Sequence, residues 1–152
     1  MRYLREKGIK VGSTTGYTDE MMRIVAPAAA EKGYCPDCWF SPNSVGNFGR
    51  PYPYMIFENL KKLEITSVSA AVKIGDTAAD IREGLAAGMP SLGVVEGSSV
   101  LGLTEEEYAA LSSEEKELCC RRAEEKFLAA GATAVLRNLS ELPAYLKKLE
   151  AE

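Results

Sequence analysis

The sequence contains no histidine and only four aspartates, and these shortages exclude several kinds of catalytic site. Without histidine there are no Ser-His or Cys-His catalytic pairs, no histidine proton shuttle and few of the usual zinc sites. No apolar run approaches the ~20 residues of a membrane-spanning helix. The N-terminal residues Met1–Arg5 are not followed by the apolar segment of a signal peptide and have the pattern of the middle of a charged helix. We therefore expect a cytoplasmic protein.

The rest of the composition is that of an ordinary globular domain. With 152 residues, 46% of them apolar and 26% charged, the chain can bury one core, which predicts a single domain over residues 1–152. Lysine and arginine number 18 against 22 acidic residues, so the net charge is −4. This balance argues against a nucleic-acid-binding surface. We expect neither nucleic acid nor a membrane as a partner.

The four cysteines allow a redox pair or half of a zinc site, because Cys35 and Cys38 have Cys-x-x-Cys spacing. A zinc site would also need Cys119 and Cys120, yet adjacent residues of a helix point in different directions. A thioredoxin-like pair would open a helix directly after a strand, whereas Cys38 precedes an extended run. Reduced thiols are the favoured interpretation.

Short β-like runs alternate with amphipathic segments along the chain, which predicts strands separated by helices. Such a pattern is typical of an α/β fold, in which a parallel sheet is covered by helices on both faces. The expected strands are Gly8–Gly12, Asp37–Phe40, Val68–Ile74, Ser91–Val95 and Ala134–Leu136. The expected helices are Arg2–Lys7, Thr18–Lys32 with a kink or a division at Pro27, Pro53–Leu63, Ala78–Ala87, Thr104–Ala130 and Ser140–Leu149.

Ligands of such folds bind in the loops that follow the strands, and two of these loops favour an anion. The loop Gly12–Thr18 has four hydroxyl side chains before a helix N-terminus, which suits a phosphate but also suits simple helix capping. The loop Gly49–Pro53 places Arg50 between a glycine and a proline. A guanidinium held there could bind phosphate, or it could be an exposed side chain in a turn.

Of the two remaining strand-end loops, one could bind a metal ion and the other could form the rim of a pocket. Asp76 follows a predicted buried strand and Asp80 lies in the first turn of the next helix, so both carboxylates fall at the same end of the sheet. Carboxylate oxygens suit Mg²⁺. Alternatively, Asp80 only interacts with the helix dipole. The loop Gly97–Ser99 could shape a pocket rim or form a simple turn.

Taken in order, three of these loops resemble the second, third and fourth motifs of the haloacid dehalogenase superfamily, and most closely those of the phosphonoacetaldehyde hydrolase family. The resemblance covers nearly the whole chain. It rests on the stretches Gly12–Thr18, Gly33–Asp37, Gly49–Met55, Val72–Met89 and Leu101–Glu107. It implies a three-layer core with a parallel sheet, a small phosphonate or phosphate ligand, and Mg²⁺-dependent hydrolysis of phosphonoacetaldehyde to acetaldehyde and phosphate.

The resemblance also implies a role for each candidate residue. Asp76 would hold Mg²⁺ and Asp80 would complete or orient the metal shell, while Lys73 would be structural or a partner of a carboxylate. The phosphoryl oxygens would be bound by Thr15 and Gly16, with Ser13 and Thr14 nearby. Arg50 would neutralise the negative charge of these oxygens.

Relative to this family, the sequence lacks the first motif, an Asp-x-Asp loop that supplies the nucleophile. It also lacks the helical cap whose lysine forms a Schiff base with the substrate. We therefore expect a core without its first strand and without the cap, a weakened affinity for Mg²⁺, and no catalytic nucleophile or turnover in this chain alone. The alternative is a non-catalytic remnant or phosphate-binding module. Because a missing central strand exposes its neighbours, we expect a homo-oligomer or an N-terminal half supplied in trans.

Overall fold

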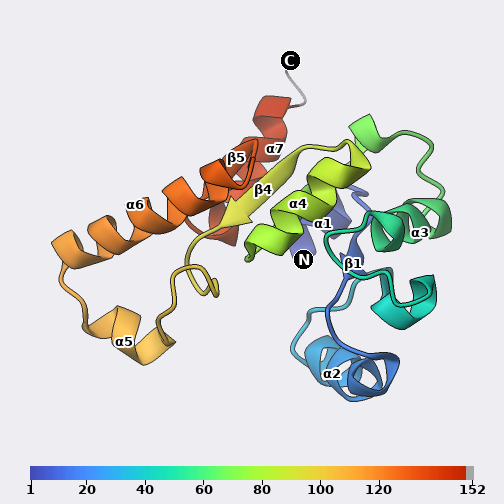
Figure 1. Ribbon diagram of the computed structural model, residues 1–152, viewed down its shortest axis with the longest axis horizontal. Helices are drawn as coiled ribbons and strands as arrows, with labels where there is room; N and C mark the ends of the chain where they lie inside the picture. Colours follow the sequence, from blue (N-terminus) through green and yellow to red (C-terminus); the bar gives the residue numbers. More distant parts are fainter. Residues whose placement is uncertain (150–152) are drawn as a thin grey trace. The chain divides into compact units, whose positions relative to one another are not determined.

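A computed structural model describes residues 1–149, and in them the chain forms seven α-helices and five β-strands (Figure 1). The described part divides into two compact units. The first contains Met1–Ala71 and Ala86–Gly88, and the second contains Val72–Leu85 and the chain from Met89 onward. Within residues 1–149, every helix is too short or too polar to cross a membrane.

The second unit is built on a parallel sheet in the order β3-β4-β5, formed by Lys73–Gly75, Ser91–Val94 and Ala134–Leu136. Ile74 pairs with Leu92, and Gly93 pairs with Val135. All four residues of β4 are buried, as expected for a central strand with both faces covered. The parallel α/β sheet predicted from the sequence is confirmed.

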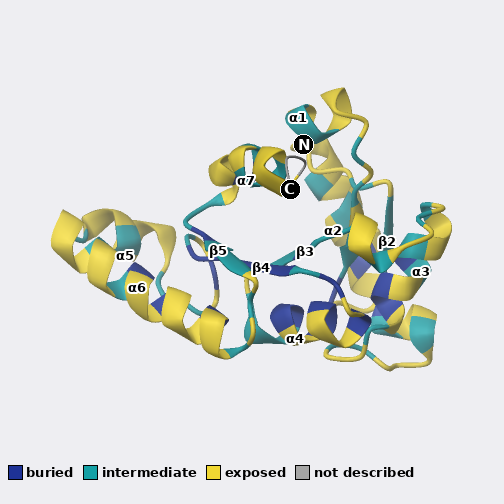
Figure 2. Cartoon of the chain, turned by 90° about the horizontal axis from the view of Figure 1, so that it is seen from above, coloured by how far each residue is buried: buried dark blue, intermediate teal, exposed yellow. Residues whose placement is uncertain are grey.

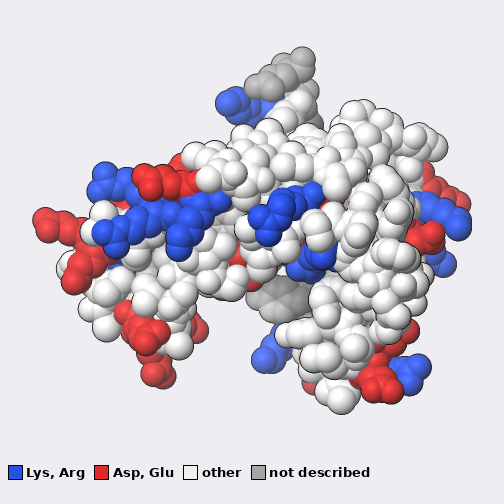
Figure 3. Space-filling model, in the orientation of Figure 1, with Lys and Arg blue, Asp and Glu red and all other residues white. Residues whose placement is uncertain are grey.

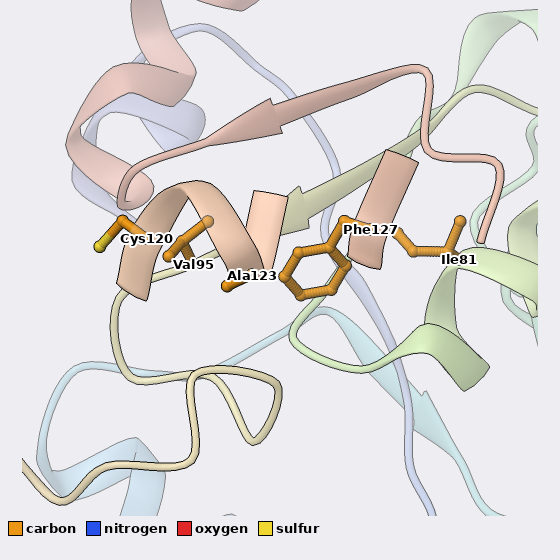
Figure 4. Packing of buried hydrophobic residues seen from close by; sticks show 5 residues of the cluster. All are labelled: Ile81, Val95, Cys120, Ala123 and Phe127. Atoms are coloured by element: carbon orange, nitrogen blue, oxygen red, sulfur yellow. The ribbon is translucent and has the colours of Figure 1, made fainter. Parts of the chain in front are cut away.

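Helices cover both faces of this sheet: α4 (Ala78–Ala87) and α6 (Ser113–Ala129) lie on one side, and α7 (Leu142–Leu149) lies on the other (Figure 2). The core under α4 and α6 contains five buried residues, shown in Figure 4. They are Ile81, Val95, Cys120, Ala123 and Phe127. A Cβ atom at Gly93 would lie 2.5 Å from Phe127 Cγ, so the glycine is what allows α6 to approach β4.

The first unit contains a second parallel sheet, in which β1 (Gly12–Thr14) pairs with β2 (Cys38–Phe40). Its helices are α1 (Arg2–Glu6), α2 (Asp19–Glu31) and α3 (Tyr54–Lys62), and α3 packs against both strands. As the sequence predicts, the hydroxyl of Thr18 caps α2 by accepting from Met21 N. The helix continues through Pro27 without division. Among residues 1–149, β1 and β3 belong to different sheets.

The strand expected at Gly8–Gly12 was placed too early, since β1 begins only at Gly12. Gly8 has a positive φ of 67° and ends the turn after α1, so the chain is not yet extended there. Val11 instead donates its N–H to Asp37 Oδ2. Ser13 and Thr14 are consequently strand residues, although the sequence placed them in the loop.

Three further expectations about element bounds were wrong for local reasons. Val68–Ala70 is a 3₁₀ turn because the Ser67 hydroxyl accepts from Ser69 N, so only the end of the expected strand Val68–Ile74 pairs. The expected helix Thr104–Ala130 is two helices, α5 (Glu105–Ala110) and α6, each starting with its own capping box. A 3₁₀ turn capped by Asn138, rather than a cap at Ser140, precedes α7.

Candidate functional site

The hydroxyl-rich segment Gly12–Thr18, here called the phosphate loop, runs from β1 to the first turn of α2. Thr15 is buried and donates its N–H to Phe40 O at 3.2 Å, which extends the β1–β2 pairing by one residue. Its hydroxyl oxygen accepts from Tyr17 N at 3.0 Å. Gly16 is exposed at the tip of the loop. The loop is therefore held at its base and open at its tip.

Arg50 lies against the phosphate loop. Its Nη2 donates to Thr14 O at 2.8 Å, and the residue is half-buried. The structure thus brings Arg50 and Thr14 together within the first unit. A guanidinium has five N–H donors in a planar fork, a geometry that suits the oxygens of an anion. The alternative of an isolated exposed arginine does not fit this contact.

The segment Gly75–Asp80, here called the aspartate loop, connects β3 to α4 in the second unit. Asp76 is exposed directly after the strand. The loop Gly97–Ser99 contacts Asp76, because Ser99 Oγ donates to Asp76 O at 3.3 Å. The Ser98 hydroxyl accepts from Leu101 N at 3.1 Å and closes that loop as a turn. The sequence named this loop as a possible pocket rim but did not predict the contact of Ser99 with Asp76.

Asp80 is buried and both of its carboxylate oxygens have partners. Lys73 Nζ lies 3.0 Å from Asp80 Oδ1, and Thr77 Oγ1 donates to Asp80 Oδ2 at 2.6 Å. Lys73 Nζ also lies 2.9 Å from Glu83 Oε2. The expectation that Lys73 partners a carboxylate is confirmed, and Glu83 is a second partner that the sequence gave no reason to choose. A Cβ at Gly75 would lie 2.1 Å from Asp80 Cβ, so the close approach requires glycine there.

These contacts define how the aspartate loop could hold a magnesium ion. Asp76 offers an exposed carboxylate, whereas Asp80 is bound by Lys73 and Thr77 and fits an orienting role better than direct coordination. Mg²⁺ keeps several waters and takes only one or two carboxylates together with phosphate oxygens, so this donor set fits it. Residues 1–149 contain no cluster of three or more histidine, cysteine or acidic side chains that could hold a metal unaided.

A further polar cluster joins the ends of β4 and β5 to α5 and lies outside the predicted loops. Arg137 donates to Glu96 at 2.9 Å and to the Tyr108 hydroxyl at 3.1 Å, and Asn138 donates to Glu96 at 2.9 Å. Burial raises the pKa of Tyr108, so the phenol stays neutral. Burial opposes ionisation of Glu96, but the bonds from Asn138, Arg137 and Tyr108 lower its pKa overall. The cluster attaches α5 to the sheet and has the character of a structural contact.

The cysteines show no redox or zinc arrangement in the described residues. Cys35 is exposed, while Cys38 lies within β2 and donates its thiol to Asn59 Oδ1 at 3.2 Å. Burial raises the pKa of the Cys38 and Cys120 thiols, which makes both poor nucleophiles.

The charged side chains on the surface are mixed in sign: Figure 3 shows lysine and arginine lying beside acidic residues. The largest group of basic side chains in that view lies over α6, with acidic side chains at its edge.

The model of the haloacid dehalogenase-like hydrolase family matches residues 1–88, and the chain belongs to this family. Within it, the chain is similar to phosphonoacetaldehyde hydrolases over nearly its whole length. It is 51% identical over 149 residues to phosphonoacetaldehyde hydrolase from Parabacteroides distasonis, covering 98% of this chain and 56% of that protein. It is 48% identical to the bifunctional phosphonoacetaldehyde hydrolase/aminoethylphosphonate transaminase from Clostridioides difficile, covering 98% of this chain and 23% of that protein.

Solved structures agree with this assignment. A phosphonoacetaldehyde hydrolase like protein from Oleispira antarctica superposes with a TM-score of 0.92 at 36% identity, over 97% of this chain and 53% of that one. A haloacid dehalogenase family hydrolase from Deinococcus radiodurans, solved with bound phosphate and sodium, has a TM-score of 0.70 at 23% identity and shows the same fold. The chain spans just over half the length of the phosphonoacetaldehyde hydrolase from Parabacteroides distasonis.

Proposed function

We propose that this chain carries the phosphate-binding and magnesium-binding residues of a phosphonoacetaldehyde hydrolase. The reaction would split the C–P bond of phosphonoacetaldehyde and give acetaldehyde and phosphate. The observation that carries the proposal is the contact of Arg50 with Thr14 at 2.8 Å, which puts a guanidinium beside the hydroxyl-rich loop that the resemblance assigns to the phosphoryl group. The 51% identity to a relative of that name supports the substrate class.

Each residue would then have a defined task. The phosphate loop would bind the phosphoryl oxygens through Ser13, Thr14, Thr15 and Gly16, and Arg50 would offset their negative charge. Asp76 would ligate Mg²⁺, while Asp80, fixed by Lys73, would orient the metal shell. When bound, Mg²⁺ would supply a positive charge that stabilises phosphoryl oxygens during transfer.

The second candidate is a phosphate-binding module without turnover. It is favoured by one observation: the 152 residues contain no Asp-x-Asp pattern, which in the family supplies the nucleophile. Without a carboxylate in that place there is no group to accept the phosphoryl group covalently. The cytoplasm is the expected location under either candidate.

The deciding experiment measures acetaldehyde release from phosphonoacetaldehyde with Mg²⁺ present, using this chain alone and together with the separately expressed N-terminal half of a relative. We expect release only from the mixture, and its loss in the Asp76→Ala variant because the direct metal ligand is gone. Binding of inorganic phosphate to this chain, measured by calorimetry, is expected in both candidates and should weaken in Arg50→Ala.

The outcomes separate the candidates. Release from the mixture supports the hydrolase, and phosphate binding without release supports the module. Turnover by this chain alone that survives Asp76→Ala would contradict the assignment of the metal site. Absence of phosphate binding would contradict both candidates.

A further inference from the structure

Asn59 of α3 is a buried polar side chain that joins three neighbouring segments of the first unit. Its Nδ2 donates to Ser13 O at 3.0 Å and to Met55 O at 2.8 Å. Its Oδ1 accepts the thiol of Cys38 at 3.2 Å. One amide thus connects the helix that follows the Arg50 loop to both strands of the sheet.

The backbone at the start of the phosphate loop is shaped to receive this side chain. A Cβ atom at Gly12 would lie 2.3 Å from Asn59 Oδ1 and 2.8 Å from its Cγ, closer than any real contact. Only glycine leaves room for the amide at that point of β1. The next residue, Ser13, then offers its carbonyl to Asn59. Gly12 and Asn59 therefore act as a matched pair.

The same contact accounts for Cys38, which the proposed function leaves without a task. Its side chain points from β2 to Asn59 and supplies the donor that the amide oxygen needs. Buried polar groups that lose their partner cost free energy, so the three bonds fix the orientation of the amide. Cys38 serves here as a small hydrogen-bond donor, and a serine could replace it in this task.

We propose that Asn59 is a positioning residue for the phosphate loop, acting through Ser13 and supported by Cys38; this rests on the proposed phosphate site. The Asn59 amide group donates to the backbone carbonyls of Ser13 and Met55, so it acts on the loop through the main chain. It fixes the strand from which Thr14 and Thr15 project. Removal of the amide should loosen the loop and weaken the binding of an anion there.

The test compares Asn59→Leu, which keeps the volume and removes the three bonds, with Ile56→Val as a matched control. Ile56 is buried on the same helix and its side chain has no polar atom, so its truncation reduces stability without removing a hydrogen bond. In Asn59→Leu we expect the Kd for inorganic phosphate to rise about tenfold, the equivalent of one lost hydrogen bond. In Ile56→Val, and in Cys38→Ser, it should stay within about twofold.

Amide hydrogen exchange at Thr15 gives a readout that does not depend on a ligand, because its N–H donates to Phe40 O. Asn59→Leu should speed exchange at Thr15 relative to Ile56→Val at equal overall stability. Equal exchange at Thr15 in the two variants would overturn the role of Asn59. A wild-type chain that binds no phosphate would instead contradict the proposed function, and the exchange rates would still decide whether Asn59 positions the loop.

Discussion

At the scale of single residues, Lys73 is a buried lysine that forms ion pairs with two buried carboxylates. Its ammonium lies between Asp80 at 3.0 Å and Glu83 at 2.9 Å, and the three side chains are at most 10% exposed. One ammonium group thus lies within ion-pair distance of two buried carboxylates. Its removal would take an ion-pair partner from each of them.

Lys73→Met should therefore lower the free energy of unfolding by about 3–5 kcal/mol, the range for a buried ion pair that loses one partner. Urea denaturation measures this. Lys61→Met is the matched control: Lys61 pairs with Glu58 at 3.8 Å but is 79% exposed, so its loss should change stability by about 0–1 kcal/mol. If the two variants are equally stable, the Lys73 cluster contributes nothing to the fold.

Thiol reactivity is a second prediction at this scale. Cys35 is exposed, whereas burial raises the pKa of Cys38 and of Cys120. Because the thiolate is the reacting form, Cys35 should give the fastest reaction with a disulfide reagent in the folded protein. Cys35→Ser should remove that fast phase. A fast phase that persists in Cys35→Ser would show that another thiol is the reactive one.

At the scale of elements, the division between α5 and α6 depends on a single cap. The Ser112 hydroxyl accepts from Glu115 N, and the Glu115 carboxylate accepts from Ser112 N. Ser112 Oγ therefore satisfies one of the N–H groups that every helix leaves unbonded at its start. The spacing of Ser112 and Glu115 is visible in the sequence, yet the run of helix-forming residues around it predicted one continuous helix.

Ser112→Ala should destabilise the protein by about 1 kcal/mol, since the alanine cannot accept from Glu115 N. Thermal denaturation with Ser113→Ala as the neighbouring control measures the difference. Ser113 is the first residue of α6 and lies outside the capping box, so its replacement should be close to neutral. Equal destabilisation by the two changes would argue against the cap.

At the scale of the whole molecule, acid stability should reflect Asp37. The N–H of Val11 and the guanidinium of Arg5 both bond to its carboxylate and hold its pKa below 3.8. A pKa that is lower in the folded than in the unfolded chain adds stability above the unfolded value, near pH 3.9. That stability disappears as the pH falls through the native pKa. Asp37→Asn should therefore flatten the loss of stability below about pH 4 in acid titration.

Self-association is the second prediction for the whole molecule. Both sheets end in edge strands, and edge strands offer backbone groups to another chain. Large exposed apolar side chains add to this tendency, among them Ile24 at 75% exposure and the clustered rings of Phe48, Tyr52 and Tyr54. We expect oligomers in light scattering at high micromolar concentration. A stable monomer there would contradict the expectation.

The sequence by itself determined the class of fold, the order of the elements and the loops that carry Thr15, Arg50 and Asp76. It could do so because hydrophobic periodicity, capping residues and motif spacing act over short distances along the chain. It misplaced β1 and the start of β3, because pairing with β2 and the cap by Ser67 decide where those segments extend.

Only the tertiary structure decided which side chains hold those loops in place. Asn59 lies 46 residues from Ser13 in the chain, and Ser99 lies 23 residues from Asp76. Glu83 reaches Lys73 only because the packing of α4 against β3 buries both. No local pattern marks such partners. Their roles follow from burial, which obliges each polar group to find a partner wherever the fold brings one within reach.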